Sequence, residues 1–238
     1  MTDRSVIATP QRSDSTDRHA GLSVLALVLL FALLSACRTA ADVAVERTTV
    51  LTWPAEAGGI AGQVIVTIRN EGGATVDADV FGRDTQTVAA LVDGSGEILP
   101  DERTIQLDAV PQTLGPGEAG YLLASFTADA PDGTVAGAKV TVNASAVEAR
   151  ARPTFDELEF EELDGGLGLS GRLEWDGEGS AVARAVALDE EGIPIGFVAT
   201  AEVRYSAGRV ELCCFPPNVA RDDIAGLEVF GILVRSDD

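Results

Sequence analysis

Apolar and polar residues alternate with a period of two over much of the chain after residue 41. In residues 60–69, one face holds Val64, Val66 and Ile68, and the opposite face holds Gln63, Thr67 and Arg69. Period-two alternation is typical of a β-strand with one face buried and the other in water. Similar runs begin near residues 76, 105 and 139, and Gly- or Asp-rich turns separate them. Short strands at spacings of about ten residues predict an antiparallel sandwich.

A second set of strands follows a break in this pattern. The charged segment 148–153 ends at Pro153 and predicts a linker. The strands expected after it cover residues 155–163, 167–175, 181–188, 193–203, 209–215 and 224–234. The sequence therefore predicts one β-sandwich domain over 42–147 and a second over 154–238. No segment in either domain has a helical period with caps.

The two predicted domains repeat short sequence features. Ile60–Val64 is similar to Leu169–Leu173, and Val92–Gly96 is similar to Leu188–Gly192. Each member of the first pair is followed by a Gly-rich turn and an alternating strand. We interpret the similarity as a tandem repeat; the alternative is two unrelated β domains that share turn chemistry.

The beginning of the chain has a different character. An unbroken apolar run, Gly21–Ala36, ends in Leu34-Ser35-Ala36-Cys37, and three arginines precede the run. This arrangement resembles the signal of a bacterial lipoprotein. In that family the chain is cut before the cysteine, which then carries the lipid. The resemblance implies a signal segment over 1–36, a lipidated tether over 37–41 and a lipid on Cys37 that holds the protein in the membrane.

Two alternatives to this signal remain. The run could be an uncleaved membrane anchor, although a spanning helix needs about 20 apolar residues and this run is shorter. The match could also be accidental. Both the lipoprotein and the anchor place the residues after the run on the extracytoplasmic side of the cell membrane or envelope.

The net charge of the chain limits which classes of molecule the protein can bind. The formal net charge is −21, and residues 37–238 carry all of it, with 35 acidic and 14 basic side chains. Such a surface repels nucleic acid, because no basic patch is present to displace the counterions of phosphates. We therefore expect no nucleic-acid partner.

The position of the only histidine limits which catalytic and metal-binding groups the mature chain can contain. The only histidine, His19, lies in the predicted signal segment. A mature chain without histidine has no Ser-His or Cys-His nucleophile pair and no imidazole ligand for a metal. We predict no catalytic residues, no metal site and no cofactor, and the only acid–base candidates are carboxylates.

Two adjacent cysteines, Cys213 and Cys214, stand in a predicted strand. Neighbouring Cα atoms are about 3.8 Å apart, which is below the usual disulfide range of about 4.4–6.8 Å. Three states remain open: two free thiols, a vicinal disulfide and an intermolecular bridge.

Acidic runs occur at Asp156–Glu162 and Asp189–Glu191, and Asp93, Glu97 and Asp101 lie near one hairpin. Calcium binds six to eight oxygen atoms at fixed loop spacings, and none of these runs fits an EF-hand loop. We interpret them as solvated faces, with a weak calcium site as the alternative.

The first predicted domain resembles the FxLYD-type domains of bacterial envelope proteins. The matching features are a glycine that opens a strand, an Asn-x-Gly turn, an Asp-x-x-Gly hairpin and Leu-x-Pro-Gly-Glu. The matching positions are Gly62, Asn70, Gly72, Leu91, Asp93, Gly96, Leu114, Pro116, Gly117 and Glu118. Ala89 and Val92 replace the Phe and Tyr of the family, and the second domain keeps only Gly171, Asp189 and Gly192.

This resemblance implies an immunoglobulin-like sandwich used for interaction or spacing, with no catalytic residues. Tyr121, after the Pro-Gly-Glu element, is expected to act as a tyrosine corner or to pack in the core, and Trp53 and Trp175 are expected to be core residues.

The sequence thus predicts an all-β protein with two tandem immunoglobulin-like antiparallel β-sandwiches after a lipoprotein signal segment. The predicted function is a lipid-anchored, non-catalytic interaction, adhesion or scaffolding module with an envelope protein partner. An unpaired edge strand is one way to accept that partner. The alternatives are an envelope binding protein for a small ligand, sugar or cation, and a carboxylate hydrolase with two acids about 5–10 Å apart.

Overall fold

The structure is a computed structural model that describes residues 42–55, 58–78, 87–99, 104–129, 134–150, 152–163, 165–175, 180–200, 203–204 and 208–234. Residues Ala40–Asp238 form one compact unit. The predicted signal segment 1–36, His19, Cys37 and Asp101 lie outside the described residues.

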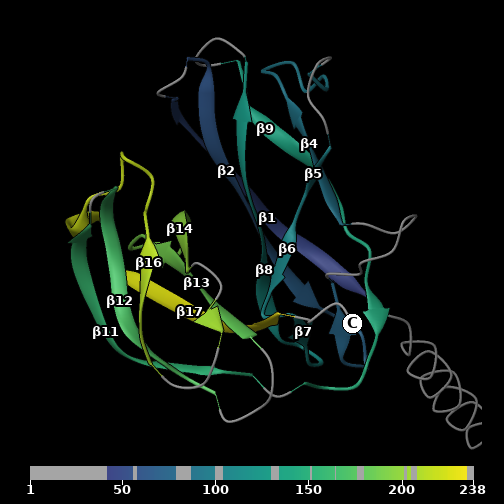
Figure 1. Ribbon diagram of the computed structural model, residues 1–238. Helices are drawn as coiled ribbons and strands as arrows, with labels where there is room; N and C mark the ends of the chain where they lie inside the picture. Colours follow the sequence, from purple (N-terminus) through teal and green to yellow (C-terminus); the bar gives the residue numbers. More distant parts are fainter. Residues whose placement is uncertain are drawn as a thin grey trace, which may run out of the picture. The chain divides into compact units, whose positions relative to one another are not determined.

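The described residues of the first half form three antiparallel sheets (Figure 1). The largest has the strand order β1 (Val43–Pro54), β2 (Ile60–Asn70), β8 (Ala119–Ala128) and β6 (Asp108–Val110). The second has the order β5 (Ile105–Gln106), β4 (Val88–Val92) and β9 (Gly137–Thr141). The third has the order β10 (Ser145–Ala146), β3 (Val76–Asp77) and β7 (Thr113–Leu114).

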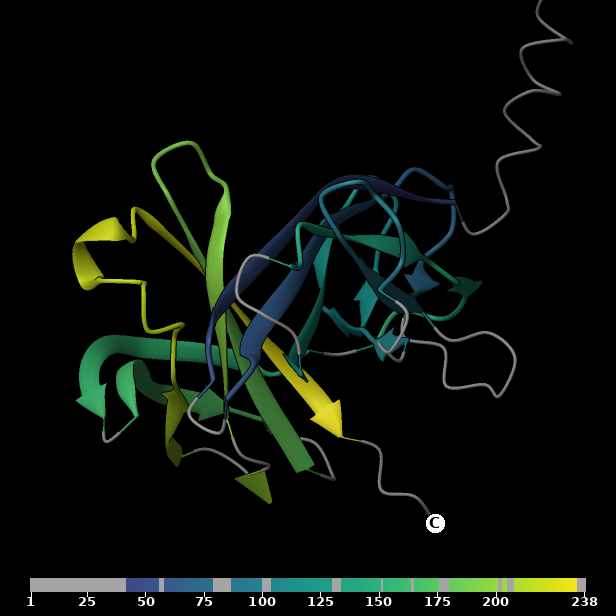
Figure 2. The ribbon, with the colours of Figure 1, turned by 90° about the horizontal axis from the view of Figure 1, so that it is seen from above.

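The second half contains one seven-stranded antiparallel sheet. Its path runs through β11 (Thr154–Leu163), β12 (Gly166–Glu174), β16 (Gly208–Cys213), β14 (Pro194–Thr200), β13 (Ser180–Leu188) and β15 (Val203–Arg204). The last strand, β17 (Gly226–Val234), pairs with β13 along its whole length, as Figure 2 shows.

The all-β prediction is confirmed for the part of the chain that the structure describes. The only helix found there is a single 3-10 turn, Arg221–Asp223. No described helix is long and apolar enough to cross a membrane. The predicted strands 155–163, 167–175 and 181–188 are β11, β12 and β13 to within two residues, because strong alternation and flanking turns fix both ends of each.

Each half has its own apolar core, and a third cluster joins the two. The first core centres on Ile60, Val64, Val66 and Leu122, and the second on Leu169, Leu212 and Phe215. The joining cluster takes Ile65, Val110, Tyr121 and Leu123 from the first half and Val186, Phe197 and Ile232 from the second. Burial of apolar surface at this joint therefore holds the two halves together.

The polar face predicted for β2 is wrong at one position. Gln63 is 5% exposed, and its neighbour on the same face, Ile65, is fully buried. The second half covers this face, so one face of β2 packs on the first core and the other packs at the joint. Alternation within one strand shows which side chains share a face. It does not show whether residues far along the chain pack against that face as a second layer.

Gln63 acts as a strand partner for β14. Its Nε2 donates to the carbonyl of Phe197 at 2.8 Å, and the N–H of Phe197 donates to its Oε1 at 2.9 Å. The described pairing of β14 with β16 covers only Ala199 and Thr200. The Gln63 amide thus satisfies two buried backbone groups that no described strand pairs on that side.

Equivalent hairpins in the two halves have the same hydrogen bonds. In the first, Asp93 N–H donates to Glu97 O and Gly96 N–H donates to Asp93 O, both at 3.0 Å. In the second, Asp189 N–H donates to Ile193 O and Gly192 N–H donates to Asp189 O, also at 3.0 Å. Gly96 and Gly192 have φ values of +82° and +74°, which favour glycine.

The same equivalence extends to the strand that pairs beside each hairpin. Ala136 N–H donates to Val92 O at 2.8 Å, and Ala225 N–H donates to Leu188 O at 2.9 Å. The similarity of Val92–Gly96 to Leu188–Gly192 therefore reflects equivalent positions in the two sets of strands, not only similar turn chemistry.

Two outer strands, β1 and β11, each pair with one neighbour among the described strands and each carry a bulge. In β1 the register shifts between Val45 and Arg47, and in β11 it shifts between Asp156 and Glu159. Glu157 in the second bulge has φ +52°. Bulges and acidic side chains on an outer strand hinder the pairing of another strand with it.

Candidate functional site

The described surface contains a hollow of about 480 Å³ where the hairpin Asp189–Gly192 faces the segment after β16. Three apolar residues contribute to its lining: Leu51 of β1, Ile195 of β14 and Val219. The polar lining residues are Asp189, Glu190, Glu191, Asn218, Asp222 and Asp223. Because Leu51 belongs to the first half, the packing of the two halves completes the hollow.

The Asp189 carboxylate fixes one wall of the hollow. Its Oδ1 accepts the N–H groups of Glu191 at 3.0 Å and of Ile193 at 2.7 Å. The side chain therefore caps its own turn, and Glu190 and Glu191 lie exposed at the tip of the hairpin.

The opposite wall comes from the 3-10 turn. The Asp223 Oδ2 accepts the N–H of Ala220 at 2.8 Å, and Asp222 is exposed. The basic residue of this turn, Arg221, points elsewhere and lies over the Phe160 ring at 3.8 Å from its centroid. Among the residues that the structure describes, five carboxylates and no basic side chain therefore line the hollow.

This arrangement favours a cationic organic group over a chelated metal. Among the described residues, no group of three or more His, Cys, Asp or Glu side chains is placed to hold a metal ion. Asp189 and Asp223 already accept backbone N–H groups. A concave acidic rim with apolar residues beside it suits an arginine or lysine, whose stem packs on apolar surface while its charged head meets carboxylates.

The acidic run on β11 makes ion pairs along the strand. The Glu161 carboxylate accepts the Ser170 hydroxyl at 2.6 Å and also pairs with Arg209. The hydrogen bond from Ser170, followed by the contacts with Arg209, lowers the pKa of Glu161. The same guanidinium lies 3.6 Å from Glu159. This geometry fits a solvated, ion-paired strand face.

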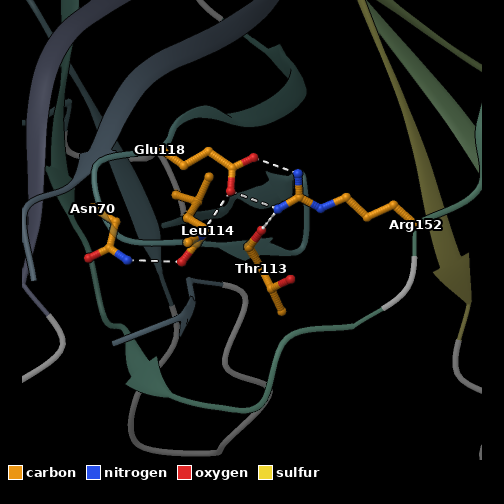
Figure 3. Close-up of polar contacts among 6 residues, drawn as sticks. Asn70, Thr113, Leu114, Glu118 and Arg152 are labelled. Carbon is orange, nitrogen blue, oxygen red and sulfur yellow. Dashed lines mark hydrogen bonds and ion pairs between the residues drawn. The ribbon is translucent and has the colours of Figure 1, made fainter. Parts of the chain in front are cut away.

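The structure brings together several residues of the FxLYD-like motif (Figure 3). Asn70 is fully buried, and its Nδ2 donates to the carbonyls of Ala74 at 2.7 Å and Leu114 at 2.9 Å. Its Oδ1 accepts the N–H of Gly72 at 2.9 Å. The Asn-x-Gly and Leu-x-Pro-Gly-Glu elements are thus two turns tied to each other by one amide.

Glu118 closes this network and joins it to the predicted linker. Its carboxylate accepts the N–H of Gly115 at 2.8 Å and both Nη atoms of Arg152, at 2.5 and 2.9 Å. Arg152 also donates to the carbonyl of Thr113 at 2.5 Å, as Figure 3 shows. The hydrogen bonds from Arg152 lower the pKa of Glu118. A second arginine of the segment, Arg150, pairs with Asp77 at 3.5 Å.

The predicted linker 148–153 is therefore attached to the first half through Arg150 and Arg152. The sequence contains a sign of this attachment. Two arginines, in a chain with few basic residues, follow a domain whose motif includes a glutamate without an assigned role.

Tyr121 takes part in the joint between the halves. Its side chain is 6% exposed and meets the Phe230 ring edge-on, with 5.9 Å between the ring centroids. Burial raises the pKa of Tyr121, and the Glu228 carboxylate, which accepts a hydrogen bond from its hydroxyl, raises it further. The hydroxyl thus bonds Glu228 of β17 in the second half, whereas a tyrosine corner would bond upstream backbone. The alternative expectation, that Tyr121 packs in the core, is confirmed.

The structure joins Cys213 and Cys214 in a disulfide, with Cys213 exposed and Cys214 half-buried. Trp53 and Trp175 are also half-buried, so neither is a central core residue.

Comparisons of the chain with protein families, with curated proteins and with solved structures found no match.

Proposed function

We propose that this chain is a lipid-anchored, extracytoplasmic, non-catalytic binding module whose acidic hollow receives a cationic segment of an envelope protein. The observation that carries the proposal is the hollow of about 480 Å³, lined by five carboxylates and by apolar residues of both halves. A lipid on Cys37 would hold the module at the membrane, and the apolar run before it supports this anchor.

We further propose that each half is an immunoglobulin-like sandwich. The order β1-β2-β8-β6 in the first half matches the A-B-E-D sheet of constant-type immunoglobulin domains. The order β11-β12-β16-β14 recurs in the second half, where β14 also continues the same sheet into β13. The equivalent hairpins at Asp93 and Asp189 support a duplicated unit.

The hollow is a better candidate than the outer strands for partner binding. Strand addition needs a regular outer strand with free N–H and C=O groups. Both β1 and β11 are bulged and carry acidic residues at the bulge, which hinders a regular ladder. A cationic segment that docks in the hollow needs no backbone pairing.

Charge-neutralising variants test this function. The triple variant Glu190→Gln, Glu191→Gln and Asp222→Asn removes three charges from the rim without changing side-chain size. Exposed ion pairs contribute about 0.2–1 kcal/mol each, so we expect the loss of three to weaken binding between about threefold and 150-fold. The matched control, Asp156→Asn, Glu157→Gln and Glu162→Gln, removes the same charge from β11.

Two measurements report the outcome. The first is the affinity for a ten-residue peptide of alternating Arg and Leu, measured by calorimetry at low and physiological salt. The second is covalent capture of partners in intact envelopes. Equal binding by the rim and control variants would refute the hollow as the site. A melting temperature that rises with calcium or with a sugar, and not with the peptide, would favour the small-ligand alternative.

A further inference from the structure

The strand β16 ends at Cys213, although its alternation of buried and exposed side chains would allow the strand to continue. Val210 and Leu212 are buried, and Arg209, Glu211 and Cys213 are exposed. Continued alternation would turn Cys214 inward and Phe215 outward. Phe215 is instead 3% exposed, with its ring 6.5 Å from the Phe160 ring. The sequence-based strand 209–215 is therefore too long by two residues.

The vicinal disulfide gives a physical reason for this change of phase. Successive side chains in a strand point to opposite faces, whereas a Cys213–Cys214 bridge needs both sulfurs on one side. The chain therefore cannot both form this disulfide and continue as a regular strand through Cys214. The chain leaves the ladder at Cys213 and returns one residue out of phase, and the N–H of Phe215 then donates to Leu167 O at 2.9 Å.

The turn between β11 and β12 packs closely against the Cys213–Cys214 bridge at Gly165. A Cβ atom at Gly165 would lie 3.0 Å from Cys214 Sγ and 3.1 Å from Cys213 Sγ. A side chain at this position would push the two sulfurs away by a few tenths of an ångström. Because Cys213 is exposed, the bridge is also accessible to a reagent from solvent.

We propose that Cys213–Cys214 is a reversible thiol–disulfide site that sets the conformation of residues 214–224. A dithiol reductant attacks one sulfur and then resolves the mixed disulfide. The S–S bond breaks, two electrons and two protons pass to the cysteines, and the reductant leaves as its own disulfide. The freed side chains then adopt the opposite faces of a regular strand.

The reduced state therefore favours an extended β16 and weakens the anchoring of Phe215. The segment that follows Phe215 carries Asn218, Val219, Asp222 and Asp223 of the hollow. If the proposed function holds, reduction also weakens binding in the hollow. This last consequence rests on the proposed function; the conformational change does not.

Hydrogen exchange of the full chain in detergent micelles tests the site. The probe is dithiothreitol, and mass spectrometry after alkylation counts the thiols released. We expect two thiols from the pair and exchange that is about tenfold faster over residues 214–224, with unchanged exchange in β13 and β17. The double variant Cys213→Ser, Cys214→Ser should exchange like the reduced chain and not respond to dithiothreitol.

Three results would overturn the proposal. One is the release of both thiols with unchanged exchange over 214–224. Another is a bridge that dithiothreitol does not open in the folded chain. The third is a pair that stays reduced even with oxidised glutathione. Because no partner or peptide is present, failure here is separate from failure of binding in the hollow.

Discussion

Gln63 offers the sharpest test of how the two halves are held together. Its amide makes two buried hydrogen bonds with the backbone of Phe197, at 2.8 and 2.9 Å. The substitution Gln63→Met keeps the volume of the side chain and removes both bonds. It leaves one N–H and one C=O of Phe197 buried without a partner.

The magnitude follows from the cost of these two groups. Each buried, unsatisfied backbone group costs about 1–3 kcal/mol, so we expect the free energy of unfolding to fall by about 2–6 kcal/mol. That is a large share of a typical total of about 5–15 kcal/mol. Gln106→Met, on the exposed side chain of β5, is the matched control and should change it by less than about 0.5 kcal/mol.

Urea denaturation followed by tryptophan fluorescence can make this measurement for each half. The chain has two tryptophans, Trp53 and Trp175, one in each half. Trp53→Phe and Trp175→Phe backgrounds therefore report the second and the first half separately. We expect the two midpoints to move apart in Gln63→Met. A loss below about 0.5 kcal/mol would show that the two bonds contribute little to the joint.

Three further predictions concern the linker, a strand glycine and the anchor. Arg152 lowers the pKa of Glu118. This carboxylate therefore stabilises the fold above its ordinary pKa near 4.5, and the contribution is lost as the pH falls through the lowered pKa. In acid denaturation, Arg152→Met should weaken this pH dependence, by less than about 1 kcal/mol because both groups are partly exposed. A side chain at Gly62 would overlap the Leu51 carbonyl and the Phe126 ring, so Gly62→Ala should lower the free energy of unfolding by about 1–3 kcal/mol, whereas Gly94→Ala, which meets no atom within 4 Å, should leave it nearly unchanged in the same assay. The intact mass of the protein from its native envelope should correspond to a chain that starts at Cys37 with added acyl groups; a chain that keeps residues 1–36 without lipid would contradict the anchor.

The sequence predicted the strands well because their signal is local. Alternation and flanking turns located β2, β11, β12 and β13, and the Asp-x-x-Gly hairpins are where the sequence placed them. The joint was not predicted, because a polar residue on a strand face gives no sign that it is buried against a distant strand. Gln63 is the clearest example: it follows the alternation and is 5% exposed.

The candidate site depended on the same kind of long-range information. The run Asp189–Glu191 was visible in the sequence as acidic residues in a turn. Its role as the wall of a hollow depends on Leu51, more than a hundred residues earlier, and on the segment after β16. Likewise, the adjacency of Cys213 and Cys214 was evident, but the change of side-chain phase at Phe215 required the burial of each residue.

The Gln63–Phe197 contact also has a consequence for the order in which the chain folds. It joins residues 134 positions apart, whereas every described strand pairing stays within one half. Closing long loops is entropically costly, and domains that emerge first during synthesis tend to fold first. The first half can therefore complete its sheets before the second half has been made. Until β14 is made, the first half would expose the Gln63 amide and its own side of the apolar joint to water, and exposed apolar surface favours aggregation or binding by a chaperone.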